Sequence, residues 1–324
     1  MSSKKQQFIR NFSKISKKDV AMAGGKGASL GELTRANIPV PPGFVILAPA
    51  FDYFMDNTPK SPVATTDMDI EAQIAKVNYD DTNSIDQASN VIRDIMHDTK
   101  IPPELAKEIE AEFKKLKAKY VAVRSSATAE DSSIASWAGE LETYLNTTNV
   151  SLLENVKRCW SSLFTPRAIF YRYEKNLVDQ QVSVAVVIQE MVQSEISGIC
   201  FTVHPITKDR NQMVIEAGYG LGEAIVSGQV TPDTYVIDKR DFSLTDINVA
   251  EQTRKIVRDI KKGNDWKSVP KSDQEKQTLT GKEIIELAKL CDKIEKHYKK
   301  PQDIEWALAK GKFYITQSRP ITTL

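Results

Sequence analysis

Residues 182–188 read Val-Ser-Val-Ala-Val-Val-Ile and form the most apolar run of the chain. Because β-branched residues dominate this run, it predicts a buried strand at the centre of a sheet. Upstream, residues 105–116 carry apolar side chains at helical spacing and lead directly into a second strand-like run, Tyr120-Val-Ala-Val123. A helix that feeds a buried strand favours a mixed sheet, and short strands and turns follow from residue 198 onward. We therefore expect a fold that contains both helices and sheets.

The size and charge of the chain limit its organisation and its partners. A length of 324 residues exceeds the size at which a single core stops growing, and the long apolar strand ends at Gln189. We therefore expect an N-terminal subdomain over 1–189 and a C-terminal subdomain over 190–324. The net charge is +1 and no apolar stretch reaches the length of a membrane span, so we expect neither a nucleic-acid nor a membrane partner. Any anion site must be local.

Cysteine and histidine usage argues against metal clusters and disulfides. Cys159, Cys200 and Cys291 lie far apart in sequence, and the three histidines are isolated from them and from one another. This spacing fits neither a zinc site nor a disulfide framework. The polar residues 1–10 are followed by no apolar segment of the kind that a secretory signal needs, so we expect a cytoplasmic protein.

The segment Gly24-Gly-Lys-Gly27 precedes an amphipathic stretch that we expect to be a helix ending at Asn37. Free N–H groups at a helix start, together with the charge of Lys26, favour phosphate binding. The segment is not a Walker A loop, because Val20 stands where its first glycine belongs and Gly27 where its Ser or Thr belongs. A tight turn with a solvated lysine is the alternative.

Two strand ends carry further candidate ligands. The stretch Arg124-Ser-Ser-Ala-Thr-Ala-Glu-Asp131 offers a guanidinium and hydroxyls that suit phosphate oxygens, with an ordinary Ser/Thr-rich surface loop as the alternative. The stretch Gln189-Glu-Met-Val192 leaves the central strand, where its backbone and apolar side chains can receive a flat heterocycle. An ordinary strand end is the alternative there.

Residues 303–319 predict a β-hairpin near the end of the chain. The period of two places Asp303 and Glu305 on one face of its first strand and the apolar side chains on the other. Two acidic side chains in a row suit a hard cation such as Mg²⁺. A structural hairpin with solvated charges is the alternative.

The length of the hairpin loop decides which side chains join the two acids. A two-residue Lys310-Gly311 turn would pair Glu305 with Thr316, whereas a three-residue loop would pair Glu305 with Gln317 and Asp303 with Arg319. The magnesium hypothesis therefore predicts the three-residue loop.

Together, six motifs resemble the N-terminal nucleotide-binding domain of the phosphoenolpyruvate synthase, pyruvate phosphate dikinase and rifampicin phosphotransferase family. The resemblance covers nearly the whole chain and is nearest to phosphoenolpyruvate synthase. Its motifs are Gly24-Gly-Lys-Gly-Ala-Ser-Leu-Gly31, Val40-Pro-Pro-Gly-Phe44, Arg124-Ser-Ser-Ala-Thr-Ala-Glu-Asp131, Gly220-Leu-Gly-Glu-Ala-Ile-Val-Ser-Gly228, Asp303-Ile-Glu305 and Gln317-Ser-Arg-Pro320.

The resemblance implies an ATP-grasp fold, in which two α+β subdomains hold ATP between them, and it implies ATP and Mg²⁺ as cofactors. The residues that it assigns to catalysis are Lys26, Arg124 and Arg319, each on phosphate. It assigns the triphosphate loop to Gly139 and Thr143, and adenine and ribose to Gln189, Glu190 and Met191. It assigns Mg²⁺ to Glu305 and Gln317, with support from Asp303.

Complete members of this family pass phosphate through a histidine on a separate swivelling domain, and then to an acceptor. None of the three histidines here has that sequence context. The resemblance therefore implies an ATP-dependent phosphotransferase of the dikinase type that is incomplete on its own. Its phosphohistidine partner would lie in a longer protein or on a separate one, with pyruvate the favoured acceptor. A rifampicin-type antibiotic phosphotransferase and a non-catalytic ATP-binding or partner-binding module are the alternatives.

Overall fold

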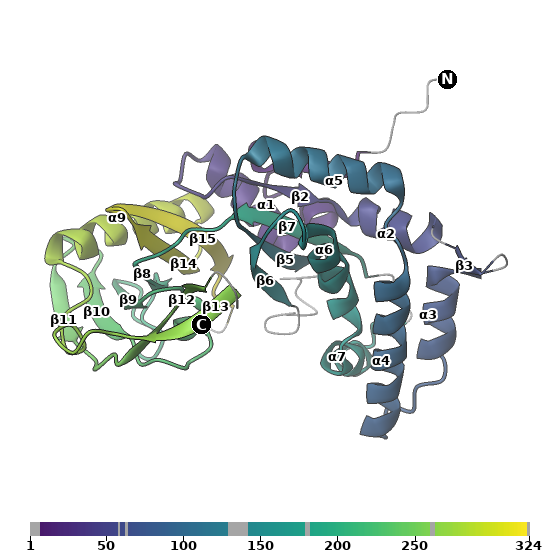
Figure 1. Ribbon diagram of the computed structural model, residues 1–324. Helices are drawn as coiled ribbons and strands as arrows, with labels where there is room; N and C mark the ends of the chain where they lie inside the picture. Colours follow the sequence, from purple (N-terminus) through teal and green to yellow (C-terminus); the bar gives the residue numbers. More distant parts are fainter. Residues whose placement is uncertain are drawn as a thin grey trace. The chain divides into compact units, whose positions relative to one another are not determined.

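A computed structural model describes residues 7–57, 59–61, 64–128, 142–178, 182–259 and 263–322 (Figure 1). The chain forms two compact units, which are described separately below. Unit 1 comprises Met1–Gly31 and Pro42–Met191, and unit 2 comprises Glu32–Pro41 and Val192–Leu324. The sequence suggested two continuous stretches that divide after Gln189. The structure divides the chain after Met191 instead and assigns the short segment Glu32–Pro41 to unit 2.

Unit 1 contains a five-stranded sheet with the apolar run at its centre. The strand order is β1 (Ile9–Asn11), β2 (Gly43–Ile46), β7 (Val184–Glu190), β5 (Val121–Ala127) and β6 (Thr143–Thr147). The expected central strand is thus confirmed as β7. The expectation of a mixed sheet is wrong, because all neighbouring strands in this sheet pair antiparallel. A helix before a strand does not fix the strand's direction when the next strand in sequence is not its neighbour.

Helices cover one face of this sheet and bury its apolar side chains. Phe44, Val123 and Ile188 belong to this core, where Trp160 stacks on Phe54 at a centroid distance of 5.0 Å. The remaining elements of unit 1 are η1 (Phe12–Lys14), α2 (Ala48–Asn57), β3 (Pro59–Ser61), β4 (Ala64–Thr65), α3 (Thr66–Ile74), α4 (Thr82–Asp98), α5 (Pro103–Leu116), α6 (Leu152–Ser161), η2 (Ser162–Phe164) and α7 (Pro166–Glu174). Helix α1 (Val20–Arg35) begins in unit 1 and ends in unit 2.

Unit 2 is built on a six-stranded antiparallel sheet with helix α9 (Gly281–Tyr298) on one face (Figure 1). A capping box of Thr280 and Glu283 starts this helix. The strand order is β11 (Leu244–Asn248), β10 (Asp233–Asp238), β9 (Gln212–Tyr219), β8 (Ile196–Phe201), β14 (Gln302–Ala309) and β15 (Lys312–Pro320). Helix α8 (Glu223–Val226) and the strand pair β12 (Arg254–Asp259) and β13 (Gly263–Ser268) complete the unit.

The segment Glu32–Pro41 belongs to unit 2 through its contacts. Leu33 and Ile38 are buried in the same core as α9, and the Ile315 N–H donates to the Pro39 carbonyl at 2.8 Å. Asn37 adopts a φ of +55° just beyond α1, as expected for a helix stop. The mixture of helices and sheets in both units confirms the α+β class. Among the described residues, no helix combines the length and the apolar character that a bilayer span requires.

Candidate functional site

The glycine-rich segment is a kink inside α1 and not a turn ahead of it. Gly24 has φ +68° and ψ 174°, and helical backbone lies on both sides of it. A side chain cannot be accommodated here, because a Cβ on Gly24 would lie 2.2 Å from the Ser126 Oγ. The Ser126 hydroxyl donates to the Ala23 carbonyl at 3.0 Å and accepts from the Gly27 N–H at 3.2 Å. One side chain of β5 therefore holds both halves of α1 and fixes where Lys26 lies.

The motif that begins at Arg124 places a cation on the face of the sheet that carries Ser126. Arg124 of β5 lies opposite Thr143 of β6, while Ala122 lies opposite Gln189 of β7. Since paired residues and residues two apart share a face, Arg124, Thr143, Gln189 and Ser126 all lie on the face away from the main core of unit 1. The Arg124 Nη1 donates to the Gln189 Oε1 at 3.3 Å, and both side chains are buried. The guanidinium is therefore oriented by a neutral amide.

The segment after β7 is less open than its sequence suggested. The N–H of Glu190 donates to the Pro42 carbonyl at 2.8 Å, and the N–H of Met191 donates to the Tyr120 carbonyl at 3.0 Å. Neither N–H is available for a heterocycle in this arrangement. Both side chains are half-buried. Gly139, which the resemblance assigns to the triphosphate loop, lies outside the described residues.

In unit 2, the hairpin has the pairing that the magnesium hypothesis needs, but the predicted loop is wrong. Lys310 and Gly311 form a two-residue turn with φ of +52° and +67°, the pattern of a type I′ turn. A β-bulge between Glu305 and Trp306 then shifts the register, so that Glu305 lies opposite Gln317 and Asp303 opposite Arg319. The additional residue comes from the strand and not from the loop.

The outcome of this register is an acidic face on the sheet of unit 2. The Gln317 Nε2 donates to the Glu305 Oε1 at 3.0 Å, and the Arg319 Nε and Nη2 lie 2.9 and 2.8 Å from the Asp303 Oδ2. Glu216 joins them, because both Glu305 and Glu216 lie opposite Ile199 on either side of β8. The sequence alone indicates no site role for Glu216. No local signal could have shown it, since the pairing of β8 with β9 and β14 brings it to this face.

Burial controls the protonation of these acids. Burial raises the pKa of Asp303, although the Arg319 charge opposes this effect. Burial and the nearby charge of Asp303 raise the pKa of Glu216. Carboxyl groups that share a buried face in this way favour a bound cation or a proton.

The donors on this face fit a magnesium ion only in part. A carboxylate and an amide on adjacent strands supply oxygens of the type that Mg²⁺ prefers, with phosphate oxygens and water as further ligands. Within the part of the chain that the structure describes, no three His, Cys, Asp or Glu side chains form a group that could hold a metal ion. Glu305 and Gln317 would therefore supply two of the oxygen ligands of such a cation.

Cysteine chemistry contributes nothing to either face. All three cysteines are buried, and burial raises the pKa of Cys159 and of Cys200. A buried thiol with a raised pKa is a poor nucleophile.

The sequence profile described as the pyruvate phosphate dikinase AMP/ATP-binding domain matches residues 20–324. The chain belongs to this family. It is 42% identical to phosphoenolpyruvate synthase of Pyrococcus furiosus, over 98% of this chain and 44% of that protein. It is 46% identical to a probable phosphoenolpyruvate synthase of Archaeoglobus fulgidus, over 96% of this chain and 41% of that protein. It is 38% identical to rifampicin phosphotransferase of Bacillus subtilis, over 98% of this chain and 36% of that protein.

This AMP/ATP-binding domain thus spans less than half the length of these relatives. Among solved structures, D-alanyl-alanine synthetase A of Vibrio cholerae is similar over 72% of this chain and 54% of that one, with 12% identity and a TM-score of 0.30. Because that score is low, the family assignment rests on the sequence match. Family membership and the two α+β units agree with the expected ATP-grasp fold.

Proposed function

We propose that this chain is the ATP-binding part of a phosphoenolpyruvate synthase-like pyruvate, water dikinase. It would bind ATP with Mg²⁺ and deliver a phosphoryl group to a phosphohistidine domain that the chain does not contain, with pyruvate as the final acceptor. The observation that carries the proposal is the family match over 20–324, together with relatives named phosphoenolpyruvate synthase that continue well beyond this domain.

Unit 1 would supply the groups that hold the phosphates and the base. We assign Lys26 and Arg124 to phosphate oxygens, because one lies just after the α1 kink and the other is buried and oriented by Gln189. A guanidinium that is already oriented needs little reorganisation as charge develops in phosphoryl transfer. We also assign Thr143 and Gly139 to the triphosphate.

The end of β7 would supply the groups that receive adenine and ribose. We assign Gln189, Glu190 and Met191 to this role. The N–H groups of Glu190 and Met191 are engaged by backbone carbonyls, so recognition would rest on the carbonyls and side chains of this segment.

Unit 2 would supply the cation-binding groups. We assign Glu305 and Gln317 to Mg²⁺, Asp303 to the support of this pair, and Arg319 to a phosphate. When bound, Mg²⁺ neutralises charge on the phosphates. In the chain itself, Arg319 is held on Asp303 and its side chain is 44% exposed, so it can exchange that partner for a phosphate without leaving a buried site.

The similarity to rifampicin phosphotransferase supports a second candidate. In that case the same ATP-binding residues would serve an antibiotic acceptor. A module that binds ATP without turnover is the third reading.

Turnover separates a catalytic module from one that only binds ATP. The full chain is incubated with ATP and Mg²⁺, with and without a separately expressed phosphohistidine domain from a phosphoenolpyruvate synthase. We expect AMP, inorganic phosphate and phosphohistidine in equal amounts, and only when the domain is present. A folded chain that binds ATP but yields no AMP with this domain or with one from rifampicin phosphotransferase would support the non-catalytic module.

A further inference from the structure

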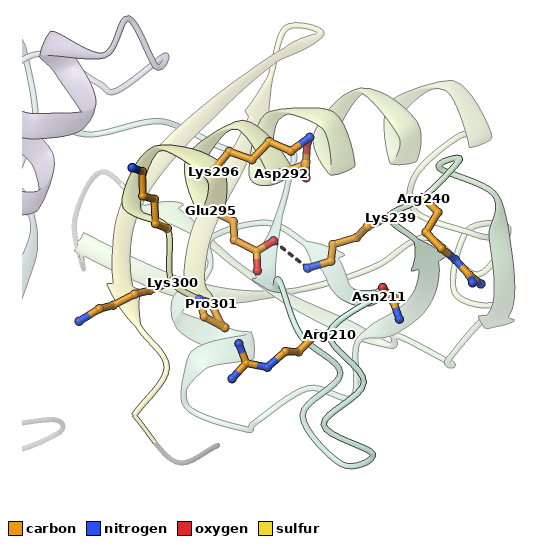
Figure 2. A pocket seen from close by; sticks show the side chains of 10 residues that line it. Arg210, Asn211, Lys239, Arg240, Asp292, Glu295, Lys296, Lys300 and Pro301 are labelled. Carbon is orange, nitrogen blue, oxygen red and sulfur yellow. Dashed lines mark hydrogen bonds and ion pairs between the residues drawn. The ribbon is translucent and has the colours of Figure 1, made fainter.

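A second charged region of unit 2 lies away from the acidic face. It is a hollow of about 530 Å³ at the carboxyl end of α9, beside the loop before β9 and the residues after β10 (Figure 2). Six of its ten lining residues are basic and two are acidic, although the whole chain has a net charge of only +1. The hollow is lined by Arg210, Asn211, Lys239, Arg240, Asp292, Glu295, Lys296, Lys299, Lys300 and Pro301.

Three of the six cations are already neutralised. In the middle of the view in Figure 2, Lys239 meets Glu295 with an Nζ to Oε2 distance of 2.7 Å. The Lys239 Nζ also donates to the Thr202 carbonyl at 2.7 Å, and the two charged side chains are only 13% and 18% exposed. Lys296 pairs with Asp292 at 2.7 Å, and Arg240 is held by Asp238. The base of the hollow is therefore a satisfied ion pair.

The other three cations have no such partner. Within the described ranges of the chain, the side chains of Arg210, Lys299 and Lys300 make no hydrogen bond or ion pair. All three are exposed and border the same hollow, although they come from two separate segments of the chain. Like charges held around one concave surface repel one another. An anion that binds between them relieves this repulsion, so the arrangement favours anion binding.

The hollow is separate from the residues assigned to ATP. Helix α9 packs on the face of the sheet that carries Cys200, Ile304 and Trp306, whereas Glu305 and Asp303 alternate with those residues and lie on the opposite face. A ligand among the α9 side chains is thus divided from the acidic face by the sheet itself.

We propose that this hollow binds a compact anion with two or more negative charges, of the phosphate-ester or diphosphate class. Its volume lies in the range of small-molecule sites, which favours a compact ligand over an extended acidic segment. The Arg210 guanidinium suits two phosphate oxygens at once, and the two lysines supply point charges. The hollow shares no residue with the proposed ATP site, so its anion binding is independent of the proposed function.

Replacement of Glu295 distinguishes an anion site from a purely structural ion pair. The Glu295 carboxylate repels an incoming anion and occupies Lys239. Replacement by glutamine removes the negative charge, keeps an oxygen that can accept from Lys239, and leaves that ammonium as a further cation for the ligand. We therefore expect Glu295→Gln to strengthen anion binding, an effect that a purely structural ion pair would not produce.

Isothermal titration of the full chain with inorganic pyrophosphate, without Mg²⁺, tests the site. We expect the double variant Arg210→Ala, Lys300→Ala to weaken one binding event by about tenfold or more, since each cation contributes a charge-assisted contact. Glu295→Gln should raise the affinity of the same site for pyrophosphate by roughly two- to fivefold. The matched control is Lys293→Ala, which removes an exposed charge of the same helix that does not line the hollow, and it should change nothing. Affinity should fall as salt is added.

Three outcomes would overturn the proposal. One is pyrophosphate binding that is lost in Lys26→Ala but unchanged in the Arg210/Lys300 double variant, because the only anion site would then be the one proposed in unit 1. Another is Glu295→Gln binding that is unchanged or weaker. The third is tighter binding of a hexaglutamate peptide than of pyrophosphate with the same dependence on the variants, which would make the hollow a docking surface for an acidic protein segment.

Discussion

The two units use the same construction to hold opposite charges. Each has an antiparallel sheet with its main apolar core on one face and functional candidates on the other, where unit 1 also carries helix α1. In unit 1 the charged group is Arg124, oriented by Gln189 on the neighbouring strand. In unit 2 it is Glu305, oriented by Gln317 on the neighbouring strand. In both sheets a neutral amide on the neighbouring strand therefore contacts a charged side chain, which is a cation in unit 1 and an anion in unit 2.

The largest expected effect comes from a substitution at the α1 kink of unit 1. We expect Gly24→Ala to destabilise the protein by about 3 kcal/mol or more, because the new Cβ overlaps Ser126 and the backbone is left-handed. Gly228 is the matched control, since it has the same φ of +68° but no atom lies within 4 Å of the place where a Cβ would stand. Gly228→Ala should cost about 1 kcal/mol. Equal losses in urea unfolding would show that Ser126 does not constrain the kink.

The next effect removes the charge of Arg124 from the sheet of unit 1. Arg124→Ala should lower the affinity for ATP by roughly 10- to 100-fold, the loss expected for a charge-assisted hydrogen bond to a phosphate. Gln189→Ala should cost less, because it loosens the guanidinium without removing it. Arg10→Ala serves as the control, since that arginine is paired with Asp19 elsewhere in unit 1. Calorimetric affinities that are equal for Arg124→Ala and Arg10→Ala would remove Arg124 from the site.

Unfolding measured over a range of pH tests the acidic face of unit 2. Because the pKa of Glu216 is raised in the folded chain, its contribution to stability is full below the ordinary carboxyl range and is lost as pH rises through the raised value. Glu216→Gln should therefore raise the unfolding temperature at pH 7 in the absence of Mg²⁺. The fall of the unfolding temperature with rising pH, above the ordinary carboxyl range, should also be smaller in this variant. The exposed Glu275→Gln should change neither. A steeper decline in Glu216→Gln would show that the sign of this assignment is wrong.

The smallest effect concerns the hairpin turn. Lys310 adopts a φ of +52°, which asparagine tolerates better, and Asn-Gly is the preferred type I′ sequence. We expect Lys310→Asn to stabilise the chain by about 0.5 kcal/mol. A loss of stability in thermal unfolding would argue against a two-residue turn.

The hairpin also shows how far the sequence could predict the site. Alternation along one strand was enough to place Asp303 and Glu305 on one face, and the pairing with Gln317 and Arg319 is confirmed. The bulge was not predicted, because a register shift inside a strand leaves no local signature as clear as that of a turn. Ile315 belongs to the core of unit 2, and Ser318 lies opposite the core residue Ile304, whereas simple alternation along the strand would place Gln317 on that face.

Features that depend on contacts between distant segments are harder to predict from the sequence. The central position of β7 follows from its apolar composition, but strand direction depends on which strands meet, and the mixed sheet was therefore a wrong prediction. The transfer of Glu32–Pro41 to unit 2 depends on Leu33 and Ile38 finding the α9 core, which no local pattern shows. Glu216 reaches the acidic face for the same kind of reason.

We propose that Lys26 and Arg124 of unit 1 bind the nucleotide itself and that the acidic face of unit 2 binds its cation. Calorimetric titration of ATP with Mg²⁺ and with EDTA, into the parent chain, Lys26→Ala and Glu305→Gln, tests it most directly. We expect Lys26→Ala to weaken binding about tenfold or more under both conditions, whereas Glu305→Gln removes most of the affinity gained from Mg²⁺ and leaves metal-free binding unchanged. A Glu305→Gln chain that retains the full effect of Mg²⁺, or a Lys26→Ala chain that binds ATP like the parent, would contradict it.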